Sequence, residues 1–271
     1  MSTHPLHHYL REGSLPHFFC AGCGAAQVLN YFLVAVDEIH LNMDSLVAIG
    51  GVGCTARIPV YLKADALHGV HGRTLPWATG IKLHNPALKV VVFAGDGDAV
   101  SIGGNHLIHT ARRNLDVTMI VVNNLTYGMT GGQVGPTTPR ALTTSTTPYG
   151  SRERPLDICN LAVVAGATFV GRSTAERPRN SISLIKKALQ HRGFALAEVV
   201  AQCPTGFGRS AIGTTDAIES LRWIKRHTTT RRQSLEADRE GLSGEFVTGI
   251  FVDKDESVFE GTSVAASEIE E

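Results

Sequence analysis

The chain has 271 residues, of which 43% are hydrophobic, and its 25 acidic and 25 basic side chains give a formal net charge of zero. This length suits one large α/β domain or two small ones, and a balanced charge gives no reason to expect nucleic acid or an anionic membrane as a partner. No apolar run approaches the roughly 20 residues that a membrane-spanning helix needs. The residues after Met1 show no basic segment followed by an apolar one, so we expect a cytoplasmic protein.

Apolar runs and helical periodicities alternate along the chain. The patterns predict helices over 24–40, 76–83, 104–113, 156–164 and 181–191, and strands over 46–50, 89–94, 117–122, 168–171 and 194–201. Strands that alternate with helices in this way predict an α/β fold with a doubly wound, mostly parallel sheet.

Two regions differ in composition from the rest. Residues 136–151 are crowded with Thr, Ser, Pro and Gly, which indicates a loop. From about residue 228 the chain becomes polar, holds one strand-like segment over 246–252 and ends in acidic residues over 268–271. We therefore predict an α/β domain over 1–227 and a C-terminal arm over 228–271 that packs on the domain or on a partner.

Polar residues follow two of the predicted strands at the point where each strand ends. Gly95 to Asp98 follow one strand, and Asn124 follows the next, 28 positions after Asp96. That spacing suits one strand–helix–strand unit, whose two strand ends meet at the same edge of a parallel sheet. Oxygen ligands there, with glycines that let the backbone approach a ligand, suit Mg2+ that carries a diphosphate. Asp96 by itself would also suit an ordinary helix cap.

Five cysteines are present, and an odd number argues against a disulfide framework in a chain without an export signal. Cys20 and Cys23 form a CxxC, which alone suits a redox dithiol, zinc or iron–sulfur. Cys54 and Cys203 each follow a predicted strand, and four thiols at one sheet edge suit a [4Fe–4S] cluster or an all-cysteine zinc site. Spacing alone does not choose between the two. Cys159 lies on an apolar helix stripe, where we expect a buried, inert thiol.

A longer motif narrows the interpretation. The sequence Tyr127-Gly-Met-Thr-Gly-Gly-Gln133, with Ile102-Gly-Gly-Asn-His106, the Gly-Asp-Gly turn and the cysteines, resembles the beta subunits of 2-oxoacid:ferredoxin oxidoreductases, most closely the 2-oxoglutarate type. The resemblance covers about residues 15–255 and departs at Ala21, where many relatives have proline. It implies a thiamine-diphosphate-binding domain of the diphosphate type. It also implies one [4Fe–4S] cluster, held by Cys20, Cys23, Cys54 and Cys203.

The resemblance assigns roles to individual residues. Asp96 and Asn124 match Mg2+ ligands through their side chains, and Thr126 matches one through its backbone carbonyl. The residues matched to cofactor binding are Val52, Gly53, Cys54, Thr55, His71, Gly95, Asp96, Gly97, Asp98, Asn124, Thr126, Gly128 and Met129. His71 outside this motif would be an ordinary surface or capped core residue.

Two residues match the reacting side of the site, Arg57 and Met129. Arg57 is suited to pair bidentately with the distal carboxylate of 2-oxoglutarate. An ordinary surface salt bridge would explain Arg57 equally well.

The activity implied by the resemblance is thiamine-dependent oxidative decarboxylation of 2-oxoglutarate, with coenzyme A, to succinyl-CoA and CO2, with electrons passing through the cluster to ferredoxin. Pyruvate or another 2-oxoacid is the alternative substrate, and a non-catalytic, zinc-stabilised binding module is the alternative from another class. Enzymes of this kind hold the cofactor between a diphosphate domain and an aminopyrimidine domain, and we find only the first here. We therefore expect an obligatory alpha subunit, with a fused or separate gamma domain, which contacts the loop over 136–151 and the C-terminal arm.

Overall fold

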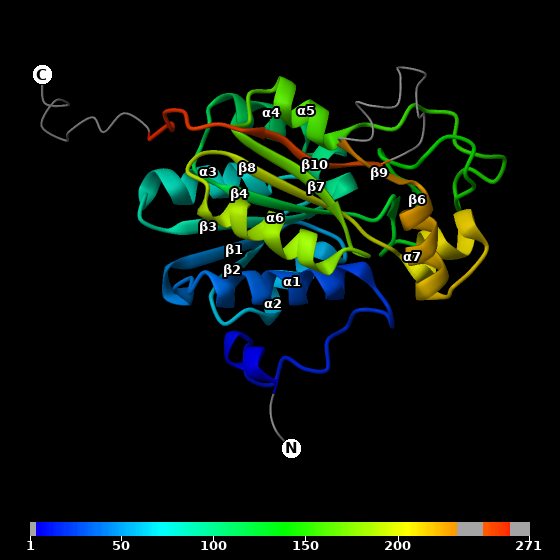
Figure 1. Cartoon of the computed structure of the whole chain (residues 1–271), viewed down its shortest axis with the longest axis horizontal. Coiled ribbons are helices and arrows are strands. Elements are labelled where there is room, and N and C mark those ends of the chain that lie inside the picture. Colours follow the sequence, from blue (N-terminus) through cyan, green and yellow to red (C-terminus); the bar gives the residue numbers. More distant parts are fainter. Residues whose placement is uncertain (1–3, 232–245, 261–271) are drawn as a thin grey trace, which may run out of the picture.

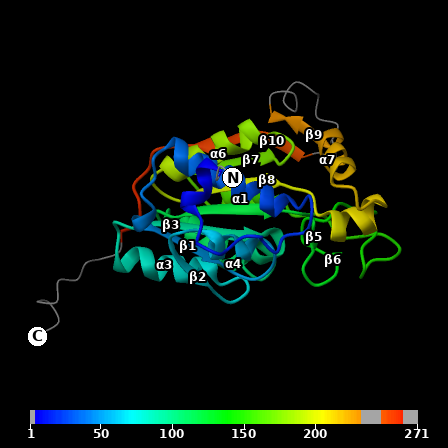
Figure 2. The same cartoon turned by 90° about the horizontal axis from the view of Figure 1, so that it is seen from below.

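Eight strands form a central sheet with helices on both faces in the computed structural model, which describes residues 4–231 and 246–260 (Figures 1 and 2). The strand order is β2-β1-β3-β4-β8-β7-β10-β9. Neighbouring strands are parallel except β10 and β7, which are antiparallel. The predicted α/β fold with a doubly wound, mostly parallel sheet is confirmed.

The described elements alternate along the chain as the patterns predict. The strands of the sheet are β1 (Leu46–Gly50), β2 (Asp65–His68), β3 (Lys89–Gly95), β4 (Thr118–Asn123), β7 (Phe169–Thr174), β8 (Ala195–Val200), β9 (Thr228–Thr230) and β10 (Phe246–Asp253), and a separate hairpin pairs β5 (Thr126–Tyr127) with β6 (Gln133–Val134). The helices are α1 (Gly24–Glu38), α2 (Ile58–Tyr61), α3 (Thr74–His84), α4 (Gly104–Arg112), α5 (Ile158–Val164), α6 (Pro178–Gln190) and α7 (Ala217–Arg226).

Every predicted helix and strand is present, and the elements that were not predicted are short, exposed or irregular. β2 is an edge strand with largely exposed side chains, so it carries no apolar run. α7 begins after Asp216, whose side chain accepts hydrogen bonds from two first-turn amides. Two π-helical segments are present: Gly97–Ser101 follows β3, and Pro204–Ile212 follows β8. No helix in the described ranges is both long and apolar enough to cross a membrane.

Alternate residues of the inner strands serve two separate cores. Val91 and Phe93 of β3 pack with α1 and α6, whereas Val90 and Val92 pack with α3, α4 and α5. Because both faces of each inner strand are buried, the strands appear in the sequence as continuous apolar runs.

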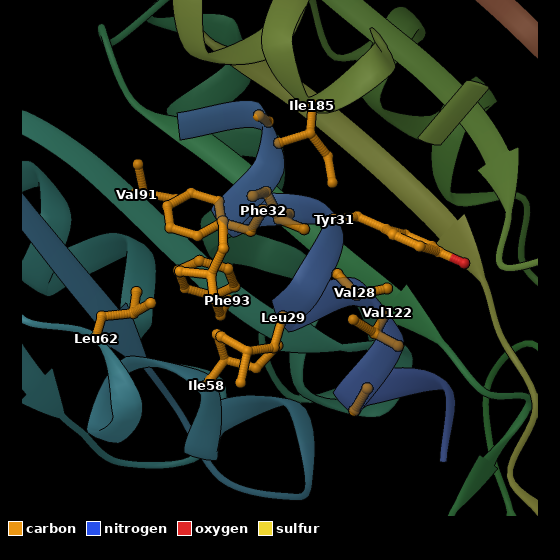
Figure 3. Packing of buried hydrophobic residues seen from close by; sticks show 14 of the residues in the cluster. Val28, Leu29, Tyr31, Phe32, Ile58, Leu62, Val91, Phe93, Val122 and Ile185 are labelled. Atoms are coloured by element: carbon orange, nitrogen blue, oxygen red, sulfur yellow. The ribbon is translucent and has the colours of Figure 1, made fainter. Parts of the chain in front are cut away.

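Aromatic packing fixes α1 on the sheet. Phe32 of α1 and Phe93 of β3 lie next to each other in the core (Figure 3). Their rings meet edge to face, with centroids 5.0 Å apart and an interplanar angle of 83°. Both side chains are fully buried. This geometry is the one that aromatic quadrupoles favour, so the pair stabilises the helix on the end of the sheet that carries the CxxC loop.

The parallel strands end together on one side of the sheet. Gly95 of β3 pairs with Val122 of β4, and Asn123 pairs with Val200 of β8. The β5–β6 hairpin and α7 lie beyond these strand ends, on the right of Figure 1. The segments that follow β3, β4 and β8 therefore leave the sheet side by side.

Two strands after residue 227 extend the same sheet. The predicted strand over 246–252 is β10, which pairs with β7, and β9 pairs with β10. The division of the chain at residue 227 stays a prediction, and the acidic end over 268–271 lies outside the described residues. Residues 136–151 form no helix or strand, as their composition indicates.

We expect a Phe93→Ala substitution to lower the free energy of unfolding by about 3–5 kcal/mol, because it removes a buried ring and leaves a cavity against Phe32. Denaturant unfolding measures the change. Val164→Ala is the matched control: Val164 is 86% exposed, so its truncation should change stability by less than about 0.5 kcal/mol. Equal effects of the two substitutions would contradict the assigned packing.

Candidate functional site

Three oxygen-bearing groups meet between the end of β3 and the turn after β4. The Asp96 carboxylate is 2% exposed. One edge of the Asn124 carboxamide lies 3.2 Å from Asp96 Oδ1 and 2.6 Å from the Thr126 carbonyl oxygen. With the amide nitrogen at that edge, both contacts are hydrogen bonds; with the amide oxygen there, three oxygens converge as they do around a hard cation. The three residues predicted as Mg2+ ligands are therefore together, and their donor set fits the ion.

The surroundings of Asp96 favour a bound cation. Burial raises the pKa of Asp96 to about 6, although the hydroxyl of Thr137 and backbone amides lower it in part, and Glu198 adds to the rise. A nearby cation stabilises a carboxylate in such a dry position. Asp96 makes no side-chain capping bond to the helical turn that follows it, so the interpretation as a helix cap is not supported.

A second carboxylate orders the loop before α3. Asp98 Oδ1 accepts hydrogen bonds from His71 Nδ1 at 2.6 Å and from the Gly72 amide at 2.7 Å, with the Val52 amide at 3.4 Å. Asp98 Oδ2 is buried and has no hydrogen-bond partner within the described ranges. A Cβ at Gly51 would overlap this carboxylate. Asp98 thus holds His71 through Nδ1 and leaves Nε2 as the ring nitrogen that could contact a diphosphate.

The β5–β6 hairpin closes over the strand ends. The ring of Tyr127 lies against Gly97 so closely that a Cβ at Gly97 would overlap it. The hydroxyl of Thr126 donates to the Gln133 carbonyl at 2.6 Å. These contacts hold the Thr126 carbonyl beside Asp96. Gly97, the second glycine of the Gly-Asp-Gly turn, therefore has a packing role in addition to any contact with a ligand.

The four cysteines predicted as cluster ligands gather at the same end of the sheet. Cys54 is in electrostatic range of the other three, and Cys23 is in range of Cys20 and Cys203. Burial raises the pKa of Cys23 and raises that of Cys54 to about 11, to which the neighbouring thiols contribute. Within the described part of the chain, no three His, Cys, Asp or Glu side chains are arranged around a point that a single metal ion would occupy. The donor set fits a group that takes thiolates and displaces their protons.

Backbone contacts bring the CxxC to the segment that follows β8. The Gly24 amide donates to the Gln202 carbonyl at 3.0 Å, and Gln202 Nε2 donates to the Gly22 carbonyl at 2.8 Å. Gly22 has a φ of +71°, and a Cβ there would overlap Ala217. A glycine is therefore required between the two cysteines of the CxxC.

The four cysteines lie next to the group formed by Asp96, Asn124 and Thr126, which we call the Asp96 corner. A Cβ at Gly128 would lie 3.0 Å from Cys203 Sγ and 3.5 Å from Asn124 Nδ2. Gly206 makes a similarly close approach to the same sulfur. The Gly128 backbone therefore lies close to both a predicted cluster ligand, Cys203, and a predicted Mg2+ ligand, Asn124.

The remaining predicted residues surround this centre less tightly. Thr55 is buried near Gly95, and Gly53 has a φ of +115°. Val52 and Met129 are each 42% exposed. Arg57 is exposed and makes no ion pair with any described residue, so the interpretation of Arg57 as an ordinary surface salt bridge is not supported.

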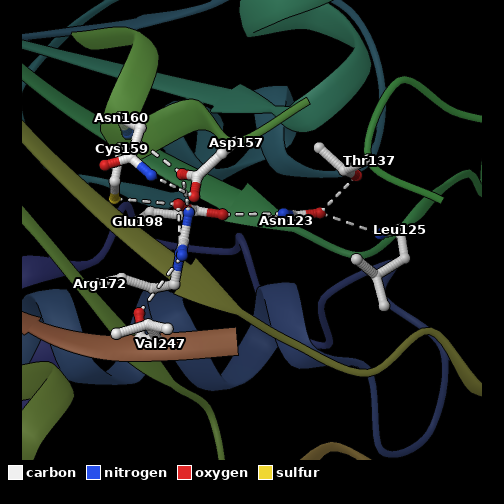
Figure 4. Close-up of polar contacts among 9 residues, drawn as sticks. All are labelled: Asn123, Leu125, Thr137, Asp157, Cys159, Asn160, Arg172, Glu198 and Val247. Atoms are coloured by element: carbon white, nitrogen blue, oxygen red, sulfur yellow. Dashed lines mark hydrogen bonds and ion pairs between the residues drawn. The ribbon is translucent and has the colours of Figure 1, made fainter. Parts of the chain in front are cut away.

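Sequence reasoning missed a buried polar network behind the Asp96 corner, which Figure 4 shows. It contains Asn123, Thr137, Arg172 and Glu198. A sequence signal existed, since a glutamate in the otherwise apolar strand Ala195–Val200 needs a buried partner. Cys159 is fully buried and its thiol donates to Glu198; burial raises its pKa well above the ordinary value, as expected for an inert thiol.

Comparison with known proteins agrees with this geometry. Residues 51–199 match the family model described as thiamine pyrophosphate enzyme, C-terminal TPP binding domain. The 2-oxoglutarate synthase subunit KorB of Methanocaldococcus jannaschii is 46% identical over 256 residues, which cover 94% of each chain. The chain belongs to the KorB family of 2-oxoglutarate synthase beta subunits.

Other relatives support the same assignment. The KorB subunit of 2-oxoglutarate synthase from Archaeoglobus fulgidus is 53% identical over 197 residues, 73% of each chain. A solved structure of the 2-oxoglutarate:ferredoxin oxidoreductase from Magnetococcus marinus, with 2-oxoglutarate, coenzyme A and succinyl-CoA bound, is similar with a TM-score of 0.83 and 31% identity, over 96% of this chain and 88% of that one. The predicted family is confirmed, and members of the KorB family are subunits of a larger oxidoreductase.

We expect Gly51→Ala to weaken thiamine diphosphate binding and to lower the melting temperature, because the new methyl group would displace the Asp98 carboxylate that holds His71. Gly104→Ala is the matched control. Gly104 begins α4 and has open space around it, so the change should be neutral or stabilise the protein by up to about 1 kcal/mol. Calorimetric titration and thermal unfolding measure both effects, and unchanged cofactor affinity in Gly51→Ala would contradict the role of Asp98.

Proposed function

We propose that this KorB-family chain is the diphosphate-binding and electron-accepting half of a 2-oxoglutarate:ferredoxin oxidoreductase. The observation that carries the proposal is the convergence of the Asp96, Asn124 and Thr126 oxygens beside four gathered thiols. The reaction is the oxidative decarboxylation of 2-oxoglutarate with coenzyme A to succinyl-CoA and CO2. Relatives 46–53% identical that are named for 2-oxoglutarate support this substrate over pyruvate.

The chain's own residues bind and orient the cofactor. Asp96, Asn124 and the Thr126 carbonyl would hold Mg2+, and His71, fixed by Asp98, would contact the diphosphate. When bound, thiamine diphosphate would supply the electron sink for decarboxylation of a 2-oxoacid. The burial of Asp96 and Asp98 lowers the local dielectric, which would strengthen the electrostatic contacts of these carboxylates to a bound group.

The four thiols are assigned to one [4Fe–4S] cluster. Four thiolates suit either zinc or this cluster, but zinc has no redox chemistry and cannot take up electrons. A two-electron oxidation that is coupled to ferredoxin needs a centre that accepts electrons one at a time. The close approach of Gly128 to Cys203 and Asn124 supports a short path between cofactor and cluster.

A separate alpha subunit would complete the active site. The chain carries the diphosphate half of a thiamine site, and the apolar side chains of Val52 and Met129 are exposed beside it. Such exposed apolar groups at a binding edge suit contact with another protein. The predicted contacts through the loop over 136–151 and the C-terminal arm, a gamma domain, and the cytoplasmic location stay predictions.

The chain purified anaerobically with its alpha subunit should contain thiamine diphosphate, Mg2+ and about four irons and four sulfides per beta chain. Cys203→Ser should lose iron, sulfide and the brown colour, because it removes one thiolate ligand. Elemental analysis and visible absorption measure the change.

Cys159→Ser is the matched control, since Cys159 is buried away from the other four thiols and a hydroxyl can keep its hydrogen bond to Glu198. It should retain the full cluster. Stoichiometric zinc without sulfide in the wild-type complex would overturn the redox role. Equal loss of iron in both variants would contradict the ligand assignment.

Arg57→Leu should raise KM for 2-oxoglutarate about tenfold or more, because it removes a charge-assisted bond to the distal carboxylate. KM for pyruvate, which lacks that carboxylate, should change little. Arg57→Lys keeps the charge and loses the bidentate geometry, so its KM for 2-oxoglutarate should lie between those of the wild type and Arg57→Leu. Steady-state reduction of ferredoxin measures each KM, and equal changes for both substrates would exclude this role.

A further inference from the structure

A buried ion pair lies between neighbouring strands behind the Asp96 corner. Arg172 of β7 and Glu198 of β8 are directly paired in the sheet register, and they are 6% and 1% exposed. Arg172 Nε donates to Glu198 Oε2 at 2.7 Å, Nη2 donates to Asp157 Oδ1 at 2.6 Å and Nη1 donates to the Val247 carbonyl at 3.3 Å. Burial alone would lower the pKa of Arg172, but Glu198 raises it above its ordinary value. The pair is therefore a fixed, charged support.

The other oxygen of Glu198 sets the orientation of an amide. Glu198 Oε1 accepts a hydrogen bond from Asn123 Nδ2 at 2.8 Å. Because the amide nitrogen faces Glu198, Asn123 Oδ1 must face the opposite way. There it accepts from the Leu125 amide at 3.2 Å and lies 2.8 Å from Thr137 Oγ1 (Figure 4).

The two partners of Asn123 Oδ1, Leu125 and Thr137, are each next to predicted Mg2+ ligands. Leu125 has a φ of +64° and lies between Asn124 and Thr126, so the bond to its amide stabilises the strained turn that presents those two residues. Thr137 Oγ1 lies 2.7 Å from Asp96 Oδ2, the oxygen opposite to the one that faces Asn124. The hydroxyl has one proton, so it can bond Asp96 Oδ2 or Asn123 Oδ1 but not both, and its support of Asp96 is therefore independent of Glu198.

We propose that Glu198 is a positioning residue for the Mg2+–diphosphate site, and that it acts through Asn123 on the turn that presents Asn124 and Thr126. The proposal rests on the proposed function, because it concerns the same site. Glu198 does not touch the position of the ion. Its role is to fix which atoms of Asn124 and Thr126 face it.

The network requires a carboxylate at position 198. Glu198 accepts from Asn123 through one oxygen and from Arg172 and Cys159 through the other. A glutamine would place an NH2 group against either Arg172 or Asn123, and two donors would then face each other. Because the guanidinium competes strongly for the remaining oxygen, the Asn123 amide would turn over and direct its nitrogen at the Leu125 amide. The turn that carries Asn124 would then lose its support.

A purely structural role for the network makes a different prediction. Arg172 and Cys159 contact the side of Glu198 that faces away from the Asp96 corner, and Arg172 also ties β7 to β10. If the network only stabilises the sheet, loss of the Cys159 contact should affect ion binding as much as loss of the Asn123 contact. If Glu198 positions ligands, loss of the Asn123 contact should weaken ion binding and loss of the Cys159 contact should not.

The experiment uses the complex with the alpha subunit, freed of Mg2+ and thiamine diphosphate by chelation and dialysis. Calorimetric titration gives Kd for Mg2+ at saturating thiamine diphosphate, and thermal unfolding of the unloaded complex is recorded alongside. Glu198→Gln and Asn123→Leu should each raise Kd for Mg2+ about 10–100-fold, as is typical when a group that supports a metal ligand is lost. Cys159→Ala, which removes a contact on the other oxygen of Glu198, should stay within about twofold of wild type.

The double variant provides a second readout. Because Glu198 and Asn123 act along one path, Asn123→Leu with Glu198→Gln should bind Mg2+ no more than about twofold more weakly than the weaker single variant. Wild-type affinity in Glu198→Gln or in Asn123→Leu would overturn the proposal, and so would a Cys159→Ala variant as weak as Glu198→Gln. If Glu198→Gln does not fold, Glu198→Asp, which withdraws the carboxylate from Asn123, replaces it, and wild-type affinity there would equally overturn the proposal. A wild-type complex that binds no thiamine diphosphate would instead overturn the proposed function.

Discussion

The parallel register of β3, β4 and β8 is the constraint on which the rest of the site depends. Gly95 is level with Val122, and Asn123 is level with Val200, so three chain segments leave the sheet at the same height. Each segment brings one component: the Asp96 turn, the Asn124 turn and the Cys203 turn. Residues more than 70 positions apart thereby become neighbours because strand pairing fixes where every segment emerges.

Burial of charge gives this edge its chemical character. Asp96 and Glu198 are almost inaccessible to water, and Asp98 Oδ2 is buried without a described partner. Charged groups in a low-dielectric position are costly unless they are compensated. Arg172 compensates Glu198, whereas the Asp96 corner offers its oxygens to a ligand. The fold thus gives Glu198 an ion-pair partner within the protein and leaves Asp96 available to bind a ligand.

Close backbone approach joins the two proposed centres. Gly128 lies against Cys203, and Gly97 accommodates the ring of Tyr127. Side chains larger than hydrogen at these positions would separate the thiols from the Asp96 corner or displace the β5–β6 hairpin. The glycines of the cofactor motif therefore act partly on the protein itself, which differs from a simple role in approaching phosphate.

The sequence by itself determined the fold class, the order of the main elements and the candidate residues for the cofactor and cluster sites. Strands buried on both faces leave continuous apolar runs, and Gly-Asp-Gly, Asn124 and the four cysteines are local patterns that need no partner to be recognised. Only the tertiary structure decided which atoms face one another. The pairing of Arg172 with Glu198, and the contacts of Thr137 with Asp96, join segments distant in sequence. They depend on strand register and on the path of an irregular loop, which local periodicity does not encode.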